Sequence, residues 1–287
     1  MRRPQSGFSW LAAFCLVLVS VPTSGQTIQF NTVYPNVIEE RLHRLAKDNG
    51  ERGKTLHSLF EESGCVGDWL TQQKVKGSRI PNVICTLTGS EEVSIVVGAH
   101  FDKDVRSAEG AIDNWSGASL LPSLFESLAS QPRRYTFVFI GFSDEERGLI
   151  GSRFYVSQLS KEQKSKIRAM VNVDSVGLSS TKVWVSRADK ELITVLSRLA
   201  AAMKFPVDGI NVDQVGNTDS YHFVRSKIPA IDFHSITQET LKLLHTPQDT
   251  LDAIQLDDYY TTYRLLTAYL AFLDVSLNRE AATEASH

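Results

Sequence analysis

Short apolar runs alternate along this chain with longer segments of mixed polarity. The runs occupy residues 93–98, 136–142, 170–173 and 228–233. Most of their residues are apolar, without strict alternation, which is typical of strands buried on both faces in a largely parallel sheet. The pattern therefore predicts several central strands of an α/β protein.

Elsewhere the spacing of apolar residues changes to that of helices. We expect helices at 36–48, 52–64, 187–203 and 257–277. No repeat, proline-rich linker or low-complexity stretch divides residues 26–287, so these residues predict one α/β sandwich domain. In the last helix, apolar side chains recur every three or four residues, and we expect this stripe to pack in the core. Its members are Tyr259, Tyr263, Leu266, Leu270, Leu273 and Leu277.

The first 25 residues have the pattern of a signal peptide. Arg2 and Arg3 precede an apolar stretch at 8–21, and residues 22–25 suit cleavage before Gln26. The alternative is an uncleaved anchor helix, but a membrane span needs about 20 apolar residues. We therefore expect a secreted or periplasmic protein that has no membrane attachment after cleavage.

Two cysteines, Cys65 and Cys85, remain after the leader. In an oxidising compartment they can form a disulfide that closes a loop of about 20 residues. The alternative is a pair of buried free thiols, and we favour it, because pairing needs a geometry that the sequence does not show.

Composition excludes some classes of function. Of the 287 residues, 42% are hydrophobic and 22% are charged, as in ordinary folded proteins. The net charge is −3 and no long basic run occurs, so we expect no nucleic-acid partner.

Side chains that can bind metals follow the predicted strands. His100 and Asp102 come after the run at 93–98, Glu145 and Glu146 after the second run, and Asp174 after the third. Asp113 opens the segment after the first strand, and His245 follows the last run. Ligand sites in open parallel sheets lie at the carboxyl ends of strands. This set of nitrogen and oxygen donors suits zinc, with manganese or cobalt as alternatives.

Each of these residues alone is weak evidence. A lone histidine is usually packed or solvated, a Glu-Glu pair is usually a solvated turn, and an aspartate before a helix is usually an N-cap. An aspartate directly after a buried strand is more telling, because an unpaired charge there is costly. Their shared placement at one sheet edge is what favours a metal site.

The motifs around these residues resemble those of the secreted di-zinc aminopeptidases and of the related glutaminyl cyclases. The resemblance extends over residues 82–275 and implies an α/β zinc-peptidase fold, a three-layer sandwich around a central, mostly parallel mixed sheet. The matching stretches are GAHFD (98–102), GAIDNWSG (110–117), FSDEERGLIGSRFY (142–155), VNVDSVG (171–177) and HTPQDT (245–250).

The resemblance also implies a role for each candidate residue. Asp113 corresponds to a carboxylate that bridges two zinc ions. The other metal ligands are His100 with Asp174 on one ion, and Glu146 with His245 on the other. Glu145 corresponds to the general base, and Asp102 to the carboxylate that orients a ligating imidazole.

The implied function is hydrolysis of the N-terminal peptide bond of peptides or proteins by a two-metal-activated water, performed by a monomer. One alternative is a glutaminyl-cyclase-like enzyme on the same fold with one zinc. The other is a catalytically silent binding domain, although all five ligand positions are filled.

Some positions depart from the pattern or are excluded from the site. Ser220 stands where the related enzymes often have a histidine, in the segment Thr218–Phe223. His222 and His234 lie outside the ligand motifs. Pro122 should kink or restart the helix after Asp113, because proline lacks an amide donor.

Overall fold

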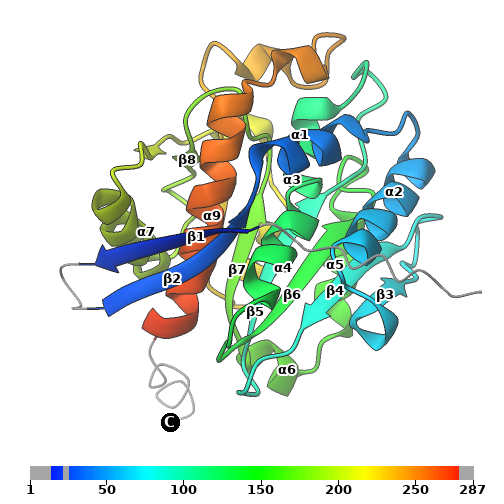
Figure 1. Ribbon diagram of the computed structural model, residues 1–287. Helices are drawn as coiled ribbons and strands as arrows, with labels where there is room; N and C mark the ends of the chain where they lie inside the picture. Colours follow the sequence, from blue (N-terminus) through cyan, green and yellow to red (C-terminus); the bar gives the residue numbers. More distant parts are fainter. Residues whose placement is uncertain (1–13, 22–25, 278–287) are drawn as a thin grey trace, which may run out of the picture.

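The computed structural model describes residues 14–21 and 26–277 of the chain, and its centre is an eight-stranded sheet (Figure 1). The strand order is β3-β4-β6-β5-β7-β10-β8-β9. The strands are β3 (Leu70–Gln73), β4 (Asn82–Leu87), β5 (Ser94–His100), β6 (Thr136–Phe142), β7 (Ile167–Val173), β8 (Lys182–Val183), β9 (Asp208–Gly209) and β10 (Ala230–His234).

The four central strands are parallel, as their apolar pattern predicts. β5 pairs in parallel with both β6 and β7, and β7 pairs in parallel with β10. β4 and β8 flank them in the antiparallel direction, which makes the sheet mixed. The chain leaves β5 for β6 on one side and then crosses to β7 on the other. The carboxyl end of β5 is therefore a switch point of the sheet, the usual place for a ligand site.

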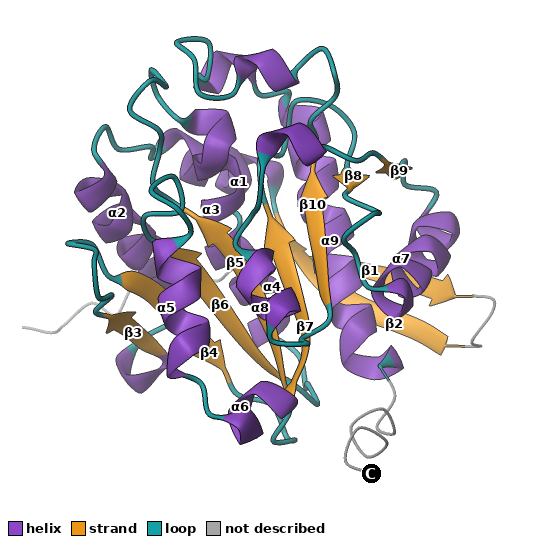
Figure 2. Ribbon diagram, turned by 180° about the vertical axis from the view of Figure 1, so that it is seen from behind, coloured by secondary structure: helices purple, strands orange, loops and turns teal. Residues whose placement is uncertain are grey.

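Helices cover both faces of the sheet. In Figure 1 the helices α1, α2, α4 and α9 lie over one face, and Figure 2 shows α5, α6 and α8 over the other. The predicted three-layer sandwich is thus confirmed. The helix bounds are α1 (Pro35–His43), α2 (Asn49–Glu62), α3 (Ser116–Ala118), α4 (Leu121–Ala129), α5 (Ile150–Gln158), α6 (Lys161–Ser165), α7 (Lys190–Met203), α8 (Ser220–Arg225) and α9 (Leu256–Ser276).

The larger core lies beneath α9 and its neighbours. All six members of the predicted α9 stripe are buried, with Tyr263 fully enclosed, so the expected core role is confirmed. A smaller core lies on the opposite face, where Phe142 and Phe223 meet edge to face. Pro122 stands in the first turn of α4, where the missing amide costs nothing, so the helix restarts there as expected.

The N-terminal part of the described chain forms a two-stranded ribbon beside α9 (Figure 1). β1 (Phe14–Val21) pairs with β2 (Gln26–Val33) in the antiparallel direction. Residues 1–13 and 22–25 of the predicted leader lie outside the described residues, and its cleavage stays a prediction. Within the described ranges, no helix is both long and apolar enough to cross a membrane.

Cys65 and Cys85 form a disulfide, so the expectation of two free thiols was wrong. Their Cα atoms are 6.3 Å apart and both side chains are fully buried. Cys65 follows α2 and Cys85 lies in β4, and α2 packs directly against this strand. The packing of helix on strand, which no local pattern reveals, is what brings the two sulfur atoms together.

Candidate metal centre

The ends of three adjacent parallel strands position most of the candidate side chains. His100 is the last residue of β5, and it stands opposite Phe142 at the end of β6. The turn after β6 carries Glu145 and Glu146, and Asp174 directly follows β7. Because the register holds these ends level, residues far apart in the sequence meet at one edge of the sheet.

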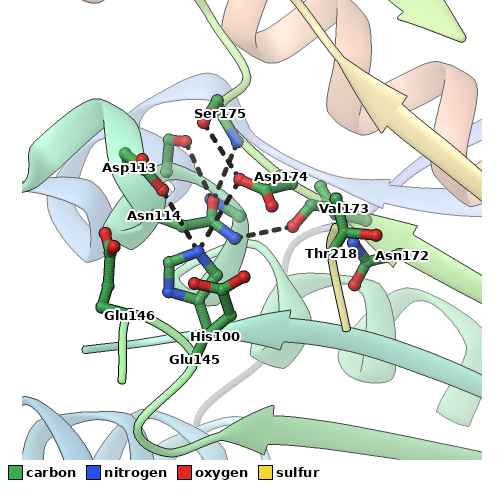
Figure 3. Close-up of polar contacts among 12 residues, drawn as sticks. His100, Asp113, Asn114, Glu145, Glu146, Asn172, Val173, Asp174, Ser175 and Thr218 are labelled. Carbon is green, nitrogen blue, oxygen red and sulfur yellow. Dashed lines mark hydrogen bonds and ion pairs between the residues drawn. The ribbon is translucent and has the colours of Figure 1, made fainter. Parts of the chain in front are cut away.

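Asp113 lies between the two histidines. Its Oδ1 is 3.2 Å from Nε2 of His100, and its Oδ2 is 3.1 Å from Nε2 of His245. Nε2 of His100 is also 3.8 Å from Oδ1 of Asp174, and Nε2 of His245 is 3.0 Å from Oε2 of Glu146. Figure 3 shows Asp113, Asp174 and the two glutamates gathered around His100. The structure thus brings together all five residues predicted as ligands, in two groups that share Asp113.

Asp102 connects His100 to the glutamate turn. Its Oδ1 is 3.5 Å from Nδ1 of His100 and accepts a hydrogen bond of 3.0 Å from the amide of Glu145. Its Oδ2 accepts from the amide of Glu146 at 3.2 Å. This fully buried carboxylate therefore lies where it can orient the imidazole, and it also fixes the backbone of both glutamates.

Asn114 is a structural residue of the site that the sequence reasoning did not assign. Its Nδ2 donates to the carbonyl of Val173, while its Oδ1 accepts from the amides of Gly117 and Ser175 (Figure 3). The side chain is fully buried and links the segment that carries Asp113 to the end of β7. The peptide bond between Asp113 and Asn114 is cis. Asn114 also begins the sequence Asn-Trp-Ser, a pattern that accepts N-glycans, but its side chain is fully buried.

Two further charged groups hold the segment that carries Asp113. Arg52 of α2 is fully buried and donates to the carbonyls of Phe101, Glu109 and Gly110, and burial lowers its pKa to about 10. Asp249 accepts a 2.7 Å hydrogen bond from the amide of Ile112. Asp249 belongs to the HTPQDT motif, which was the only sequence signal for its involvement.

The buried charges of the site interact strongly. Burial alone would lower the pKa of His100, but Glu145 and hydrogen bonds to Asp102, Asp113 and Asp174 raise it well above its usual value. Burial opposes ionisation of Asp113, yet its hydrogen bonds to the two histidines lower its pKa overall. Burial also raises the pKa of Glu145 well above the ordinary range.

The charges of His245 and Glu146 also shift each other's pKa. Contacts with Asp113 and Glu146 raise the pKa of His245 to about 10, while burial raises the pKa of Glu146. Oε1 of Glu146 is buried and has no hydrogen-bond partner among the described residues. Carboxylates outnumber imidazoles here, and an orphaned buried oxygen remains, so this donor set fits divalent cations such as zinc.

A cavity of about 550 Å³ opens beside the metal centre. Its inner wall consists of the candidate ligands and Glu145. Among the described residues that line it, every ionisable side chain belongs to that group. The rest of the lining combines six large apolar residues with a few neutral polar ones. The apolar residues are Leu149, Trp184, Val212, Ile236, Leu241 and Leu244, and the polar ones are Ser175, Gln214, Asn217 and Thr218.

The two histidines excluded from the site lie elsewhere. His234 uses both ring nitrogens for backbone hydrogen bonds, to the carbonyl of Ile210 and from the amide of Ile236. His222 packs its ring against that of Tyr221. Ser220 donates to the buried carboxylate of Asp232, as Thr218 does, so the departure from the family pattern serves to fix the start of α8.

Asp219 is a buried carboxylate to which the sequence assigned no role. Only 1% of its surface is exposed, and both of its oxygens are without hydrogen-bond partners within the described part of the chain. Burial raises its pKa to about 7. Its charge acts on Glu145 and His100, which places it behind the centre.

Comparisons with known proteins agree with this geometry. The chain is 32% identical over 181 residues to the aminopeptidase YwaD of Bacillus subtilis, covering 61% of this chain and 40% of that relative. The chain thus spans less than half the length of this relative. Among solved structures, it is similar to a zinc aminopeptidase from Bacillus subtilis, with 26% identity, a TM-score of 0.61 and coverage of 67% and 49% of the two chains.

Two more distant structures share the fold. The aminopeptidase LapA of Legionella pneumophila has a TM-score of 0.75 at 22% identity, over 85% of this chain and 73% of LapA. A glutaminyl cyclase from an Acidobacteriales bacterium has a TM-score of 0.68 at 17% identity, over 84% of this chain and 93% of the cyclase. The family model described as peptidase family M28 matches residues 82–270, more than half of the sequence. The chain therefore belongs to peptidase family M28.

Proposed function

We propose that this chain is a zinc-dependent aminopeptidase with two metal sites. The observation that carries the proposal is the position of Asp113, whose two carboxylate oxygens face one histidine each. His100 and Asp174 would hold one zinc ion, Glu146 and His245 the other, and Asp113 both. When bound, the two ions would acidify a water and polarise the scissile carbonyl.

Glu145 is the general base of the proposed reaction. It lines the cavity beside the ligands, and its backbone is fixed by Asp102. The carboxylate takes a proton from the attacking water and passes it to the leaving amine. The neighbouring Glu146 remains available as a ligand.

The cavity favours substrates with a large apolar N-terminal residue. Its lining includes Trp184, Val212 and Leu241 beside neutral polar residues and, among the described lining residues, no charge outside the metal centre. A charged side chain would lose its hydration there without gaining a partner. We therefore propose leucine-like and aromatic termini as the preferred substrates. The buried disulfide supports an extracytoplasmic location, as the signal-peptide pattern predicts.

The glutaminyl-cyclase-like reaction is the second candidate, and the shared fold supports it. The first experiment therefore compares zinc content, release of arylamine from Leu, Phe, Lys and Glu arylamides, and cyclisation of a peptide with N-terminal glutamine. We expect two zinc ions, cleavage of the Leu and Phe substrates, and loss of activity with a chelator. Cyclisation without arylamide cleavage would replace the proposal by the second candidate.

Substitution of the base tests the mechanism. Glu145→Gln should lower kcat by about 10²–10⁴-fold because it removes proton transfer, while zinc content stays the same. Glu92→Gln is the matched control, since Glu92 is exposed and pairs only with Lys166 among the described contacts. Near-normal turnover in Glu145→Gln would refute the assignment of the base.

A further inference from the structure

The loop after β5 brings a second charged pair to the metal centre. Arg106 extends to His245, and its Nη2 lies 3.0 Å from Nδ1 of the imidazole. The carboxylate of Asp104 holds this guanidinium with two hydrogen bonds. Nε of Arg106 donates to Oδ1 at 2.7 Å, and Nη2 donates to Oδ2 at 3.1 Å. Oδ1 also accepts from the backbone amide of Arg106 at 2.7 Å. Neither residue belongs to the motifs that the sequence analysis singled out.

The contact between Arg106 and His245 cannot persist unchanged once His245 binds a metal. Nε2 faces Asp113 and Glu146, so it is the nitrogen that would bind the ion. A guanidinium only donates hydrogen bonds, so Arg106 offers the ring no acceptor. When a ring nitrogen binds a metal, it uses its lone pair, and the proton must move to the other nitrogen. Metal binding by Nε2 therefore leaves two donors, Nδ1–H and Arg106, facing each other.

Asp104 is the acceptor that can resolve this conflict. One of its carboxylate oxygens, one oxygen of Glu146 and one ring nitrogen of His245 all lie within 4.8 Å of one another. The side chain of Asp104 is 14% exposed and therefore well fixed, whereas that of Arg106 is 64% exposed and free to turn towards solvent. The unpartnered Oε1 of Glu146 is a separate sign that the surroundings of His245 are arranged for a cation.

We propose that Asp104 is the positioning residue of His245, and that Arg106 leaves Nδ1 when Nε2 binds a metal. In the loaded state Asp104 accepts the Nδ1–H hydrogen bond, as Asp102 is placed to do for His100. Arg106 acts as a competitor that occupies Asp104 and Nδ1 until the ion arrives. The inference deepens the proposed function, because it rests on His245 as a ligand of the second metal site.

The test measures zinc affinity, not catalysis. The folded, metal-free chain is titrated with zinc against a chromogenic chelator, for the wild type and for Asp104→Asn, Asp104→Glu and Arg106→Met. Asp104→Asn should weaken the weaker of the two zinc sites by about 10–100-fold, the usual effect of losing such a carboxylate. Asp104→Glu should restore part of the affinity. Arg106→Met should bind zinc as tightly as the wild type or more tightly.

The variants separate this role from a merely structural one. If Asp104 served only to hold the loop through Arg106, then Arg106→Met would lose as much affinity as Asp104→Asn, and the proposal would be overturned. Unchanged zinc binding in Asp104→Asn would overturn it as well. Asp68→Asn is the control, because Asp68 is exposed on a short turn between α2 and β3.

A second readout follows the ring proton directly. Nitrogen-15 NMR of the zinc-loaded protein should show a proton on Nδ1 of His245, with a chemical shift that Asp104→Asn changes and Arg106→Met does not. The same Nδ1 shift in the wild type and in Asp104→Asn would contradict the hydrogen bond to Asp104. Arylamide cleavage is assayed separately, so an active enzyme with unaltered zinc affinity in Asp104→Asn would refute this inference and leave the proposed function intact.

Discussion

His234 shows how a buried histidine can serve the fold without serving the metal centre. It is 3% exposed at the end of β10. Nε2 donates to the carbonyl of Ile210 at 3.0 Å, and Nδ1 accepts from the amide of Ile236 at 3.1 Å. Protonation of Nδ1 would break the second hydrogen bond inside an apolar cluster. Accordingly, burial lowers the pKa of His234 to about 4.

This histidine should make the fold sensitive to acid. Its folded-state pKa lies below the value of about 6.5 in an unfolded chain, so the unfolded state binds more protons between these values. The contribution of neutral His234 to the free energy of unfolding is complete above about pH 6.5 and falls as the pH drops towards 4. At pH 5 the loss should be about 2 kcal/mol.

Urea unfolding at pH 7.5 and pH 5 checks this expectation in the wild type and in His234→Gln. The variant keeps an amide donor but does not titrate. Other buried acids contribute equally to both proteins and cancel in the difference. If both proteins lose the same stability on acidification, His234 is not the responsible group.

The candidate ligands and Asp102 beside His100 could be named from the sequence, but the residues that hold the backbone of the site could not. His100 and Asp174 stand at or after the end of a predicted strand, and Asp113 lies in a motif that resembles those of the family. Such positions can be recognised in the sequence alone. The role of Asn114 depends on Val173 and Ser175 across a tertiary contact. Likewise, the pairing of Arg106 with His245 joins residues 139 positions apart.

At the scale of elements, the disulfide joins the end of α2 to β4 and closes a loop whose ends are 20 residues apart. Cys65→Ala with Cys85→Ala should lower the free energy of unfolding by about 3 kcal/mol, because the unfolded chain regains the entropy of this loop. Urea denaturation of the double variant and of the reduced wild type measures the effect. A loss well under 1 kcal/mol in both would show that the packing of α2 on β4 already supplies the constraint.

The elements with strong patterns were predicted well, and short ones were not. Strands β5 and β6 and helix α9 lie within one or two residues of their expected bounds, because each carries a sustained apolar pattern. The second N-terminal helix begins earlier than expected, since the Asp48 side chain caps it by accepting from the amide of Glu51. β3 and β4, of four and six residues, extend the parallel strands in the antiparallel direction, and no pattern in the sequence predicted them.

At the scale of the whole molecule, the candidate ligands come from positions 100 to 245 and meet only in the folded chain. Zinc should therefore bind the native state selectively and stabilise it. With free zinc at 100 times its Kd, the gain should be about 2.7 kcal/mol, and a chelator should reverse it. Thermal melts of the wild type and of His245→Ala test this, since the variant lacks one of the proposed ligands. Equal zinc-induced shifts in both proteins would exclude His245 from metal binding.

The three-layer architecture could be inferred from the sequence because the four parallel strands are mostly apolar and are separated by helical segments. The ribbon of β1 and β2 could not be inferred in the same way, since residues 14–21 match a leader as well as a strand. Its contact with α9, where the Tyr263 hydroxyl accepts from the amide of Val33 at 2.8 Å, spans 230 positions of the chain.

The cavity joins two parts of the molecule with different origins. Most of the candidate metal ligands stand at or near the ends of central strands, whereas Val212, Leu241 and Leu244 belong to short helical turns and their borders. Exchange of these three residues can thus change which side chains fit the cavity while the candidate ligands stay in place. The fold is therefore a suitable scaffold for engineering enzymes that remove chosen residues from the N-terminus of a polypeptide.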